Sequence, residues 1–162
     1  MKPRNALSVC IIVLLTLFVS PVWSQTIYLV RHAEKIDESR DPALSLPGQK
    51  RAIDLALHLR DAEIKKIYVS EFQRTQKTAE ILAAQINVTP QILPAKDVAK
   101  LAAILKSETE NVLVVAHSNT LPDILKALGV ANVTPVEDNE YDRLVLLQLK
   151  KNAEPSMQVL RY

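Results

Sequence analysis

The sequence has very little glycine and cysteine. Its 162 residues include two glycines, Gly48 and Gly129, and one cysteine, Cys10. Two glycines so far apart cannot build a glycine-rich phosphate loop, which excludes a P-loop and a dinucleotide-binding fingerprint. A single cysteine excludes a disulfide framework, an iron–sulfur cluster and any zinc site made of cysteines.

Aromatic residues and net charge are also low. Aromatic residues make up 4% of the chain and the formal net charge is +2, with no basic stripe, which argues against nucleic acid as a partner. Hydrophobic residues make up 48% and charged residues 23%, the balance of an ordinary globular protein. The length predicts one domain.

The first 24 residues have the pattern of a secretory signal peptide. Lys2 and Arg4 precede a mostly apolar run over residues 6–19, and Val22 and Ser24 are small enough for cleavage after Ser24. The apolar run is short for a membrane-spanning helix, which needs about 20 residues. The alternative is an uncleaved N-terminal membrane anchor.

Cleavage would leave one domain, residues 25–162. Cys10 would leave with the signal, and the numbers of basic and acidic residues would become equal because Lys2 and Arg4 are lost. A thiol-free, neutral chain suits an oxidising compartment. We therefore expect a periplasmic or secreted protein with no stable membrane association after cleavage.

Strand and helix patterns alternate along residues 25–162. Strands are predicted at residues 26–31, 66–70, 88–93, 111–116, 143–150 and 157–162, and helices at residues 49–61, 75–85, 97–106 and 120–128. Pro47 and Gly48 are assigned to the loop before the first helix. The alternation predicts an α/β fold, a three-layer α/β/α sandwich with a mostly parallel central sheet and helices on both faces.

Histidines and arginines follow the three clearest strands. Arg31 and His32 end the first strand, Arg74 comes shortly after the second, and His117 directly follows the strand at residues 111–116. Ligands of such sheets bind at the carboxyl ends of the strands, so these side chains are expected to converge. Two guanidinium groups match a phosphate, and a neutral imidazole is a competent nucleophile. A metal site is the competing interpretation, but it needs a third ligand, and the two arginines would repel a divalent cation.

The strand ends resemble the motifs of the histidine phosphatase superfamily, which has a phosphoglycerate-mutase-like fold. Residues 29–35 (Leu-Val-Arg-His-Ala-Glu-Lys) resemble its Arg-His-Gly signature, with Ala33 in place of glycine. Residues 70–80 resemble its Ser-x-x-x-Arg-x-x-x-Thr-Ala block, and residues 114–118 its second-histidine block. Residues 44–52 resemble the segment that precedes the family's first helix.

The resemblance implies a reaction and its residues. His32 would attack phosphorus and become phosphohistidine, while Arg31, Arg74 and His117 hold the phosphoryl group until water releases phosphate. No metal or other cofactor is implied. The chain would thus be a metal-independent phosphatase for a small phosphomonoester or phosphoramidate, such as a sugar phosphate or phosphohistidine. The alternatives are a non-catalytic phosphate-binding module on the same fold and a phosphoglycerate-mutase-type phosphotransferase.

The remaining candidates each have a second interpretation. Asp97 is the candidate general acid or a helix N-cap. Glu34 and Lys35 contact the substrate or form solvated ion pairs, and Ser118 and Asn119 bind substrate or cap the helix that follows His117. Ser70 either orients the segment at residues 70–80 or simply ends a strand. We expect His58 to be structural.

Overall fold

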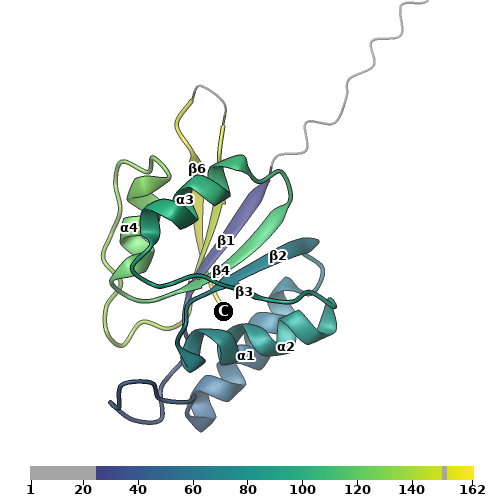
Figure 1. The fold of residues 1–162 in the computed structure, drawn as a ribbon, viewed down its shortest axis with the longest axis vertical. Coiled ribbons are helices and arrows are strands. Elements are labelled where there is room, and N and C mark those ends of the chain that lie inside the picture. The colour runs from purple at the N-terminus through teal and green to yellow at the C-terminus, as the bar shows by residue number, and fades with distance from the viewer. Residues whose placement is uncertain (1–24, 151–152) are drawn as a thin grey trace, which may run out of the picture.

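The fold is seen in a computed structural model that describes residues 25–150 and 153–162 (Figure 1). Its strands are β1 (Thr26–Arg31), β2 (Ile64–Val69), β3 (Gln91–Ile92), β4 (Asn111–Ala116), β5 (Arg143–Gln148) and β6 (Ser156–Arg161). Its helices are α1 (Leu46–Leu59), α2 (Gln73–Gln85), α3 (Val98–Ser107) and α4 (Thr120–Ala127). The predicted signal peptide, residues 1–24, lies outside the described residues. No helix within the described residues is long and apolar enough to cross a membrane.

The six strands form one sheet in the order β3-β2-β4-β1-β5-β6. The first four in this order run parallel, and β5 is antiparallel to both β1 and β6. The centre of the sheet, β4 and β1, is almost fully buried because Val, Ile and Leu fill both strands. Such strands, apolar on both faces, need a cover on each side.

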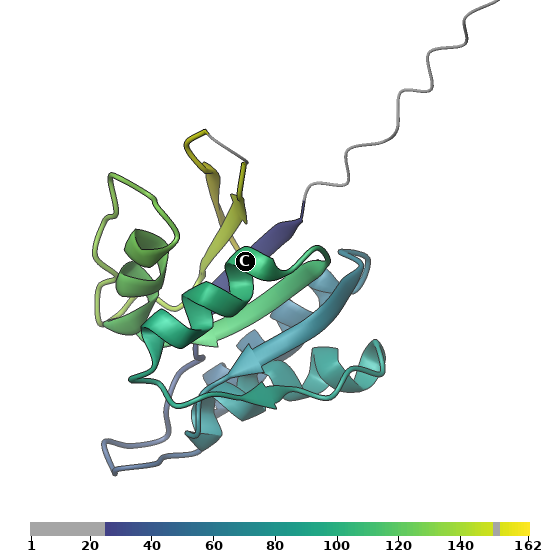
Figure 2. The same ribbon diagram turned by 45° about the horizontal axis from the view of Figure 1, so that its top comes forward.

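Helices cover both faces of this sheet, as Figures 1 and 2 show. On one face α1 and α2 pack Leu55 and Leu82 against Ile67 and Leu113. On the other face α3 and α4 bury side chains that include Leu105 against the opposite side chains of the same strands. The predicted three-layer α/β/α sandwich with a mostly parallel sheet is confirmed.

The first helix begins earlier than its sequence pattern predicted. Ser45 is its N-cap and accepts a hydrogen bond from the Gly48 N–H, so Pro47 and Gly48 lie in the first turn and not in a loop. Proline is tolerated there because the first N–H groups of a helix have no helical partner. Gly48 is required by space: a Cβ at this position would lie 2.2 Å from the Glu34 carbonyl oxygen.

Two other expectations differ from the structure. Only Gln91 and Ile92 of the strand predicted over residues 88–93 pair with β2, since Pro90 cannot donate to a ladder. Ile53 and Leu57 of α1 are about half exposed, although their spacing matched a buried helical face. The buried stripe of α1 instead runs along Ala52, Leu55, Ala56 and Leu59.

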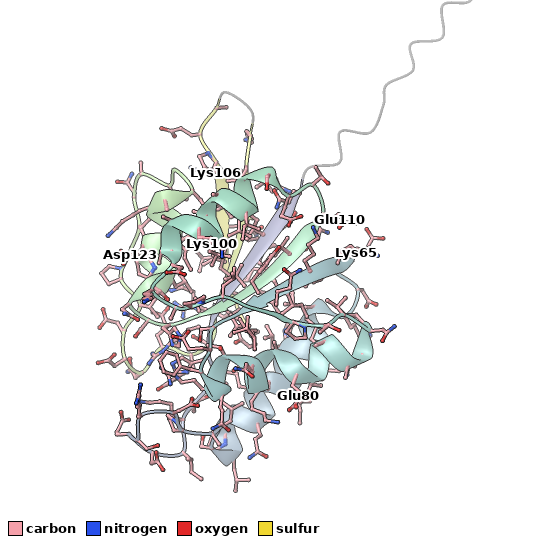
Figure 3. All side chains as sticks on the ribbon, viewed as in Figure 1. Lys65, Glu80, Lys100, Lys106, Glu110 and Asp123 are labelled. Carbon is pink, nitrogen blue, oxygen red and sulfur yellow. The ribbon has the colours of Figure 1, made fainter. Side chains whose placement is uncertain are left out.

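Charged side chains spread over the outer surface rather than gathering in one region. Figure 3 labels six exposed examples from several parts of the fold, two of them on α3, namely Lys65, Glu80, Lys100, Lys106, Glu110 and Asp123. Lys65 and Glu110 lie at the amino ends of β2 and β4. The buried charged and polar side chains are found at the opposite, carboxyl ends.

Candidate active site

The carboxyl ends of three strands bring the predicted residues together. Arg31 is the last residue of β1 and His32 follows it, while His117 follows β4, the neighbour of β1 in the sheet. The His32 N–H donates to the Ala116 carbonyl oxygen at 2.9 Å and so extends the ladder by one residue. The two imidazole rings consequently lie edge to face, with their centroids 5.3 Å apart. Arg74 comes from the first turn of α2, which follows β2.

His32 is fixed in one tautomer by a backbone carbonyl. Its Nδ1 lies 2.8 Å from the Ala33 carbonyl oxygen, which can only accept, so neutral His32 carries its proton on Nδ1. The lone pair is then on Nε2. The Ala33 N–H in turn donates to the Thr78 hydroxyl at 2.9 Å, which ties this loop to α2.

Both histidines are held neutral at physiological pH. Burial lowers the pKa of His32 to about 3, helped by the nearby His117, Arg31 and Arg74 and opposed by the Ala33 carbonyl. Burial likewise lowers the pKa of His117 to about 4, with Arg74 and Arg31 acting in the same direction and Glu71 against it. A neutral imidazole keeps a lone pair available for attack.

The Arg31 guanidinium is held by the loop that precedes β5. Its Nη1 donates to the carbonyl oxygens of Glu137 and Asp138 at 2.9 Å each and of Glu140 at 3.3 Å. Its Cζ lies 4.1 Å from the centre of the Tyr141 ring, in a cation–π contact. No carboxylate of the described residues pairs with Arg31, and its buried Nε has no partner there.

The Arg74 guanidinium has even fewer compensating contacts than the Arg31 guanidinium. It stacks on Phe72, with Cζ 4.3 Å from the ring centre, and its buried Nε has no hydrogen-bond partner within the described residues. Burial lowers its pKa, and Asp41 and Glu71 act against that change from a distance. Buried donors without partners call for a ligand, and two guanidinium groups select an anion.

A pocket of about 390 Å³ opens between these side chains. Its walls come from β1 and the loop after it, the start of α2, the start of α4 and the loop before β5. The lining residues are Arg31, His32, Lys35, Phe72, Arg74, Ala95, His117, Ser118, Asn119, Thr120 and Asp138. The four residues predicted to hold and attack a phosphoryl group, Arg31, His32, Arg74 and His117, all lie in this wall.

A family model described as the histidine phosphatase superfamily, branch 1, matches residues 27–96, which hold three of these four residues. Over this segment the chain has the sequence pattern of the histidine phosphatase superfamily. The fourth residue, His117, lies beyond the matched segment and reaches the site through the pairing of β1 with β4.

Proteins of this superfamily are similar to the chain in sequence and in fold. A protein named "Probable phosphoglycerate mutase GpmB", from Erwinia tasmaniensis, is 36% identical over 64 residues, which are 35% of this chain and 30% of that protein. The chain therefore matches less than a third of that relative's length. The protein histidine phosphatase SixA, in complex with tungstate, aligns with a TM-score of 0.69 at 20% identity over 85% of this chain and 97% of its own. A mycobacterial glucosyl-3-phosphoglycerate phosphatase aligns with a TM-score of 0.65 at 14% identity over 86% and 98%.

Glu34 is not among the residues that line the pocket. Its carboxylate takes a two-pronged ion pair from Arg51 of α1, at 2.7 Å from Nη2 and 2.9 Å from Nε. The structure thus contains an ion pair of Glu34, and its contact with substrate stays a prediction. Lys35 does line the pocket, and its ammonium pairs with the exposed Glu38.

Asp97 lies beside the pocket and not in its wall. It lines a separate small cavity of about 20 Å³ behind His117 and Ser70. It occupies the N-cap position of α3, but its side chain makes no capping hydrogen bond. The acidic residue that lines the pocket of about 390 Å³ is Asp138, which the sequence pattern did not predict because residues 137–141 follow no helix or strand pattern.

Ser118 and Asn119 line the pocket at the start of α4, and their contact with substrate stays a prediction. Neither side chain caps the helix. Asn119 makes no capping bond, and the Thr120 hydroxyl instead accepts the His117 N–H at 3.1 Å. The pocket wall at this point is the amino end of α4, the positive end of the helix dipole, which favours an anion in the pocket.

The side chains that line the pocket suit an anion better than a cation. Within residues 25–150 and 153–162 no three His, Cys, Asp or Glu side chains gather as metal ligands. His58, expected to be structural, lies on the exposed side of α1 and outside the pocket. Its Nδ1 is 2.8 Å from the Asp54 carbonyl oxygen. Its geometry is that of a side chain bonded to its own helix.

Proposed function

We propose that this histidine phosphatase superfamily member is a metal-independent phosphatase that forms a phosphohistidine at His32. One observation carries the proposal: two neutral histidines and two guanidinium groups without carboxylate partners surround one pocket. The arrangement offers a nucleophile and preorganised positive charge to a tetrahedral dianion. The fold of the solved relatives agrees with this chemistry without deciding the substrate.

In the first step the His32 Nε2 lone pair attacks phosphorus. A P–N bond forms while the bond from phosphorus to the leaving oxygen or nitrogen breaks, and the leaving atom takes a proton. Nδ1–H stays on the Ala33 carbonyl and shares the positive charge that develops on the ring. Arg31, Arg74 and the start of α4 stabilise the negative charge on the three phosphoryl oxygens.

In the second step water attacks the phosphohistidine. The new P–O bond replaces the P–N bond, water loses a proton, and the electron pair returns to His32 Nε2. Inorganic phosphate leaves and neutral His32 is restored. The low pKa of His32, set by burial, favours this return to the neutral ring.

The proposed chemistry draws its positive charge from side chains instead of a metal. Arg31, Arg74 and Lys35 all line the pocket, and their charges oppose the binding of a divalent cation beside the two imidazoles. Chelation with EDTA should leave turnover of an aryl phosphate unchanged. Loss of activity that zinc or magnesium restores would overturn the metal-independent mechanism.

The substrate class is a small phosphomonoester or phosphoramidate. The pocket, about 390 Å³, has room for a phosphoryl group and a compact leaving group. The solved relatives include a protein histidine phosphatase and a glucosyl-3-phosphoglycerate phosphatase, which makes phosphohistidine and sugar phosphates the first compounds to test. A phosphotransferase of the mutase type is the second candidate, favoured by the partial match to a named mutase.

Covalent labelling tests the proposal and separates it from a binding module. His32→Ala should abolish both turnover and acid-labile labelling from a phosphate donor. His117→Ala should slow turnover by roughly two to four orders of magnitude, the scale of a lost charge-stabilising or acid–base group, and leave label at residue 32. His58→Ala is the matched control, because His58 lies outside the pocket. Rapid-quench mass spectrometry locates the label, and label on His117 without any on His32 contradicts the assignment.

We also propose that the protein is exported and cleaved after Ser24. The charged start, the apolar run and the small residues Val22 and Ser24 support this, and so does the absence of cysteine from residues 25–162. Protein recovered from the periplasm should begin at Gln25 by N-terminal sequencing. Intact Met1 on membrane-bound protein would establish the anchor instead.

A further inference from the structure

The two site histidines are held by hydrogen-bond partners of different kinds. His32 Nδ1 faces a carbonyl oxygen, which accepts only. His117 Nε2 faces the Ser70 hydroxyl at 3.0 Å, and a hydroxyl can donate or accept. The backbone therefore fixes the tautomer of His32, whereas a side chain decides that of His117.

Ser70 is itself part of a buried chain of hydroxyls. Its Oγ lies 2.9 Å from Thr75 Oγ1 and also accepts the Phe72 N–H at 3.3 Å. Thr75 Oγ1 accepts the Ser70 N–H at 3.1 Å and lies 2.9 Å from the Phe72 carbonyl oxygen. Ser70 is 5% exposed and Thr75 is fully buried, so no solvent competes for these bonds.

The hydrogen-bonded row of His117, Ser70 and Thr75 has two self-consistent arrangements of its protons. In the first, Thr75 donates to Ser70, Ser70 donates to His117 Nε2, and His117 carries its proton on Nδ1. In the second, His117 Nε2–H donates to Ser70, Ser70 donates to Thr75, and Thr75 donates to the Phe72 carbonyl. The two arrangements place opposite functions on His117 Nδ1: a donor in the first and an acceptor in the second.

His117 Nδ1 is the ring nitrogen left for a ligand. His117 lines the pocket, its Nε2 is taken by Ser70, and Nδ1 has no partner among the described residues. Nor is Nδ1 among the buried unpartnered atoms of that region, so it is open to a ligand or water. A phosphoryl oxygen can accept from Nδ1–H but would repel a lone pair there.

We propose that Ser70 is a positioning residue that donates to His117 Nε2 when a phosphoryl group occupies the pocket, so that neutral His117 presents Nδ1–H to that group. Thr75 completes the device by donating to Ser70. The inference rests on the proposed function, since it assumes that the pocket binds a phosphoryl group. To the proposed function it adds an explanation of how His117 donates a hydrogen bond to the phosphoryl group while staying neutral next to Arg31 and Arg74.

The protonation state of His117 can be read directly by ring-nitrogen NMR. The chain has three histidines, so a protein labelled with ¹⁵N-histidine gives a simple spectrum, and His58→Gln and His117→Gln assign the signals. Inorganic phosphate is the probe, added to saturation at neutral pH. We expect neutral His117 with the proton on Nδ1, and neutral His32 with its proton also on Nδ1.

Ser70→Ala removes the donor and should change both structure and rate. The His117 proton should no longer be confined to Nδ1, and kcat should fall roughly 10- to 100-fold, the scale of one lost hydrogen bond to a buried group. KM should change by less than kcat, because Arg31 and Arg74 still bind the phosphoryl group. Thr75→Val should act in the same direction, and Thr75→Ser, which keeps the hydroxyl, should restore both readouts. Ser107→Ala at the exposed end of α3 is the matched control.

The outcomes separate this inference from the proposed function. If inorganic phosphate shifts no ring-nitrogen signal of His32 or His117, the result contradicts both the phosphate site and the role of Ser70. If phosphate shifts His32 but His117 is an imidazolium or carries its proton on Nε2, only the role of Ser70 falls. Should Ser70→Ala fail to fold, the wild-type spectrum alone still decides between the three states of His117.

Discussion

At the scale of single residues, two carboxylates compete for the task of protonating the leaving group. Asp138 lines the pocket, and its carbonyl oxygen is fixed by Arg31 at 2.9 Å. Asp97 lines only the small cavity behind His117. A general acid must reach the leaving atom, and its help grows with the proton that this atom needs. Position in the wall therefore favours Asp138, and the role of Asp97 stays a prediction.

Asp138→Asn should slow the hydrolysis of an alkyl phosphate by about 10²-fold or more while changing that of an aryl phosphate much less, because an aryl leaving group needs little protonation. Asp97→Asn should affect both substrates equally and weakly. The ratio of kcat/KM for the two substrates is the measurement. The reverse pattern, with Asp97 alone selective for the alkyl ester, would return the acid role to Asp97.

The four main site residues could be predicted because parallel strands end at one edge. Arg31, His32 and His117 directly follow apolar strands whose ends the fold must bring together. The residues around them could not be predicted. Tyr141 stacks on Arg31 from a loop with no periodic pattern, and the Ser70–His117 bond depends on side-chain directions that strand boundaries do not specify.

At the scale of elements, α1 and the loop after His32 are joined by a very close approach. Gly48 in the first turn of α1 leaves no room for a Cβ beside the Glu34 carbonyl, and Arg51 one turn later holds the Glu34 carboxylate. Glu34 is two residues after the proposed nucleophile. The packing of α1 thus sets the path of the loop that follows His32.

Gly48→Ala should lower the free energy of unfolding by about 1–3 kcal/mol, the usual cost of forcing an atom into a packed site. It should also lower kcat, because the backbone at Glu34 must move and His32 is close along the chain. Urea unfolding and aryl phosphate turnover are the two measurements. Lys50→Ala, on the exposed side of the same turn, is the control, and equal stability of the Gly48 and Lys50 variants would contradict the steric explanation.

The loop before β5 is a second element that supports the site. Arg143 holds it by donating to the Thr134 and Pro135 carbonyl oxygens, at 3.1 and 2.9 Å, and to the Glu140 carboxylate at 2.7 Å. The same loop supplies the carbonyl oxygens that hold Arg31 Nη1. Fixing the loop therefore also fixes the Arg31 guanidinium, one of the two that line the pocket.

Arg143→Met should raise KM for an aryl phosphate by roughly 5- to 30-fold, as expected when bonds worth about 1–2 kcal/mol no longer position Arg31. The effect on kcat should be smaller, since His32 keeps its own carbonyl partner. Arg60→Met provides the control, because Arg60 forms only an exposed ion pair with Asp61. An unchanged KM would show that the loop carbonyls do not depend on Arg143.

Element prediction from the sequence succeeded where the pattern was strong. Residues 111–116 form β4 as predicted, because the five residues after Asn111 are buried at the centre of the sheet and leave a continuous apolar run. It failed at the start of α1, where Pro47 and Gly48 have the composition of a loop but the geometry of a first helical turn. Residue propensities do not distinguish a loop from a first helical turn here. Gly48 is required because a larger residue would clash with the Glu34 carbonyl oxygen, which is distant in the sequence.

At the scale of the whole molecule, two buried neutral histidines make stability depend on pH. Unfolding exposes His32 and His117 to water and raises their pKa from about 3 and about 4 to the ordinary value of 6.5. Between these limits the unfolded chain binds more protons than the folded one. The free energy of unfolding therefore falls as the pH drops from 6.5 toward 4.

Replacing both histidines by asparagine should flatten this dependence. Each buried neutral histidine contributes a slope of at most about 1.4 kcal/mol per pH unit in this window. Urea unfolding of the wild type and of the His32→Asn/His117→Asn protein at about pH 7, 5.5 and 4.5 compares the slopes. Equal slopes in the two proteins would mean that the histidines are not buried in their neutral form.

The position of β1 has a consequence for the order in which the molecule can form during synthesis. β1 is the first strand along the chain, yet its two neighbours in the sheet are β4 and β5, residues 111–116 and 143–148. A ribosome delivers the N-terminus first, so β1 waits with both edges bare until β4 emerges, and with one edge bare until β5 follows. Residues 26–31, a mostly apolar segment, thus remain exposed for most of translation, and His32 beside them acquires its surroundings only when β4 and the loop before β5 have emerged. A nascent chain stopped before residue 143 should consequently be inactive, bind chaperones through this segment and stay sensitive to protease.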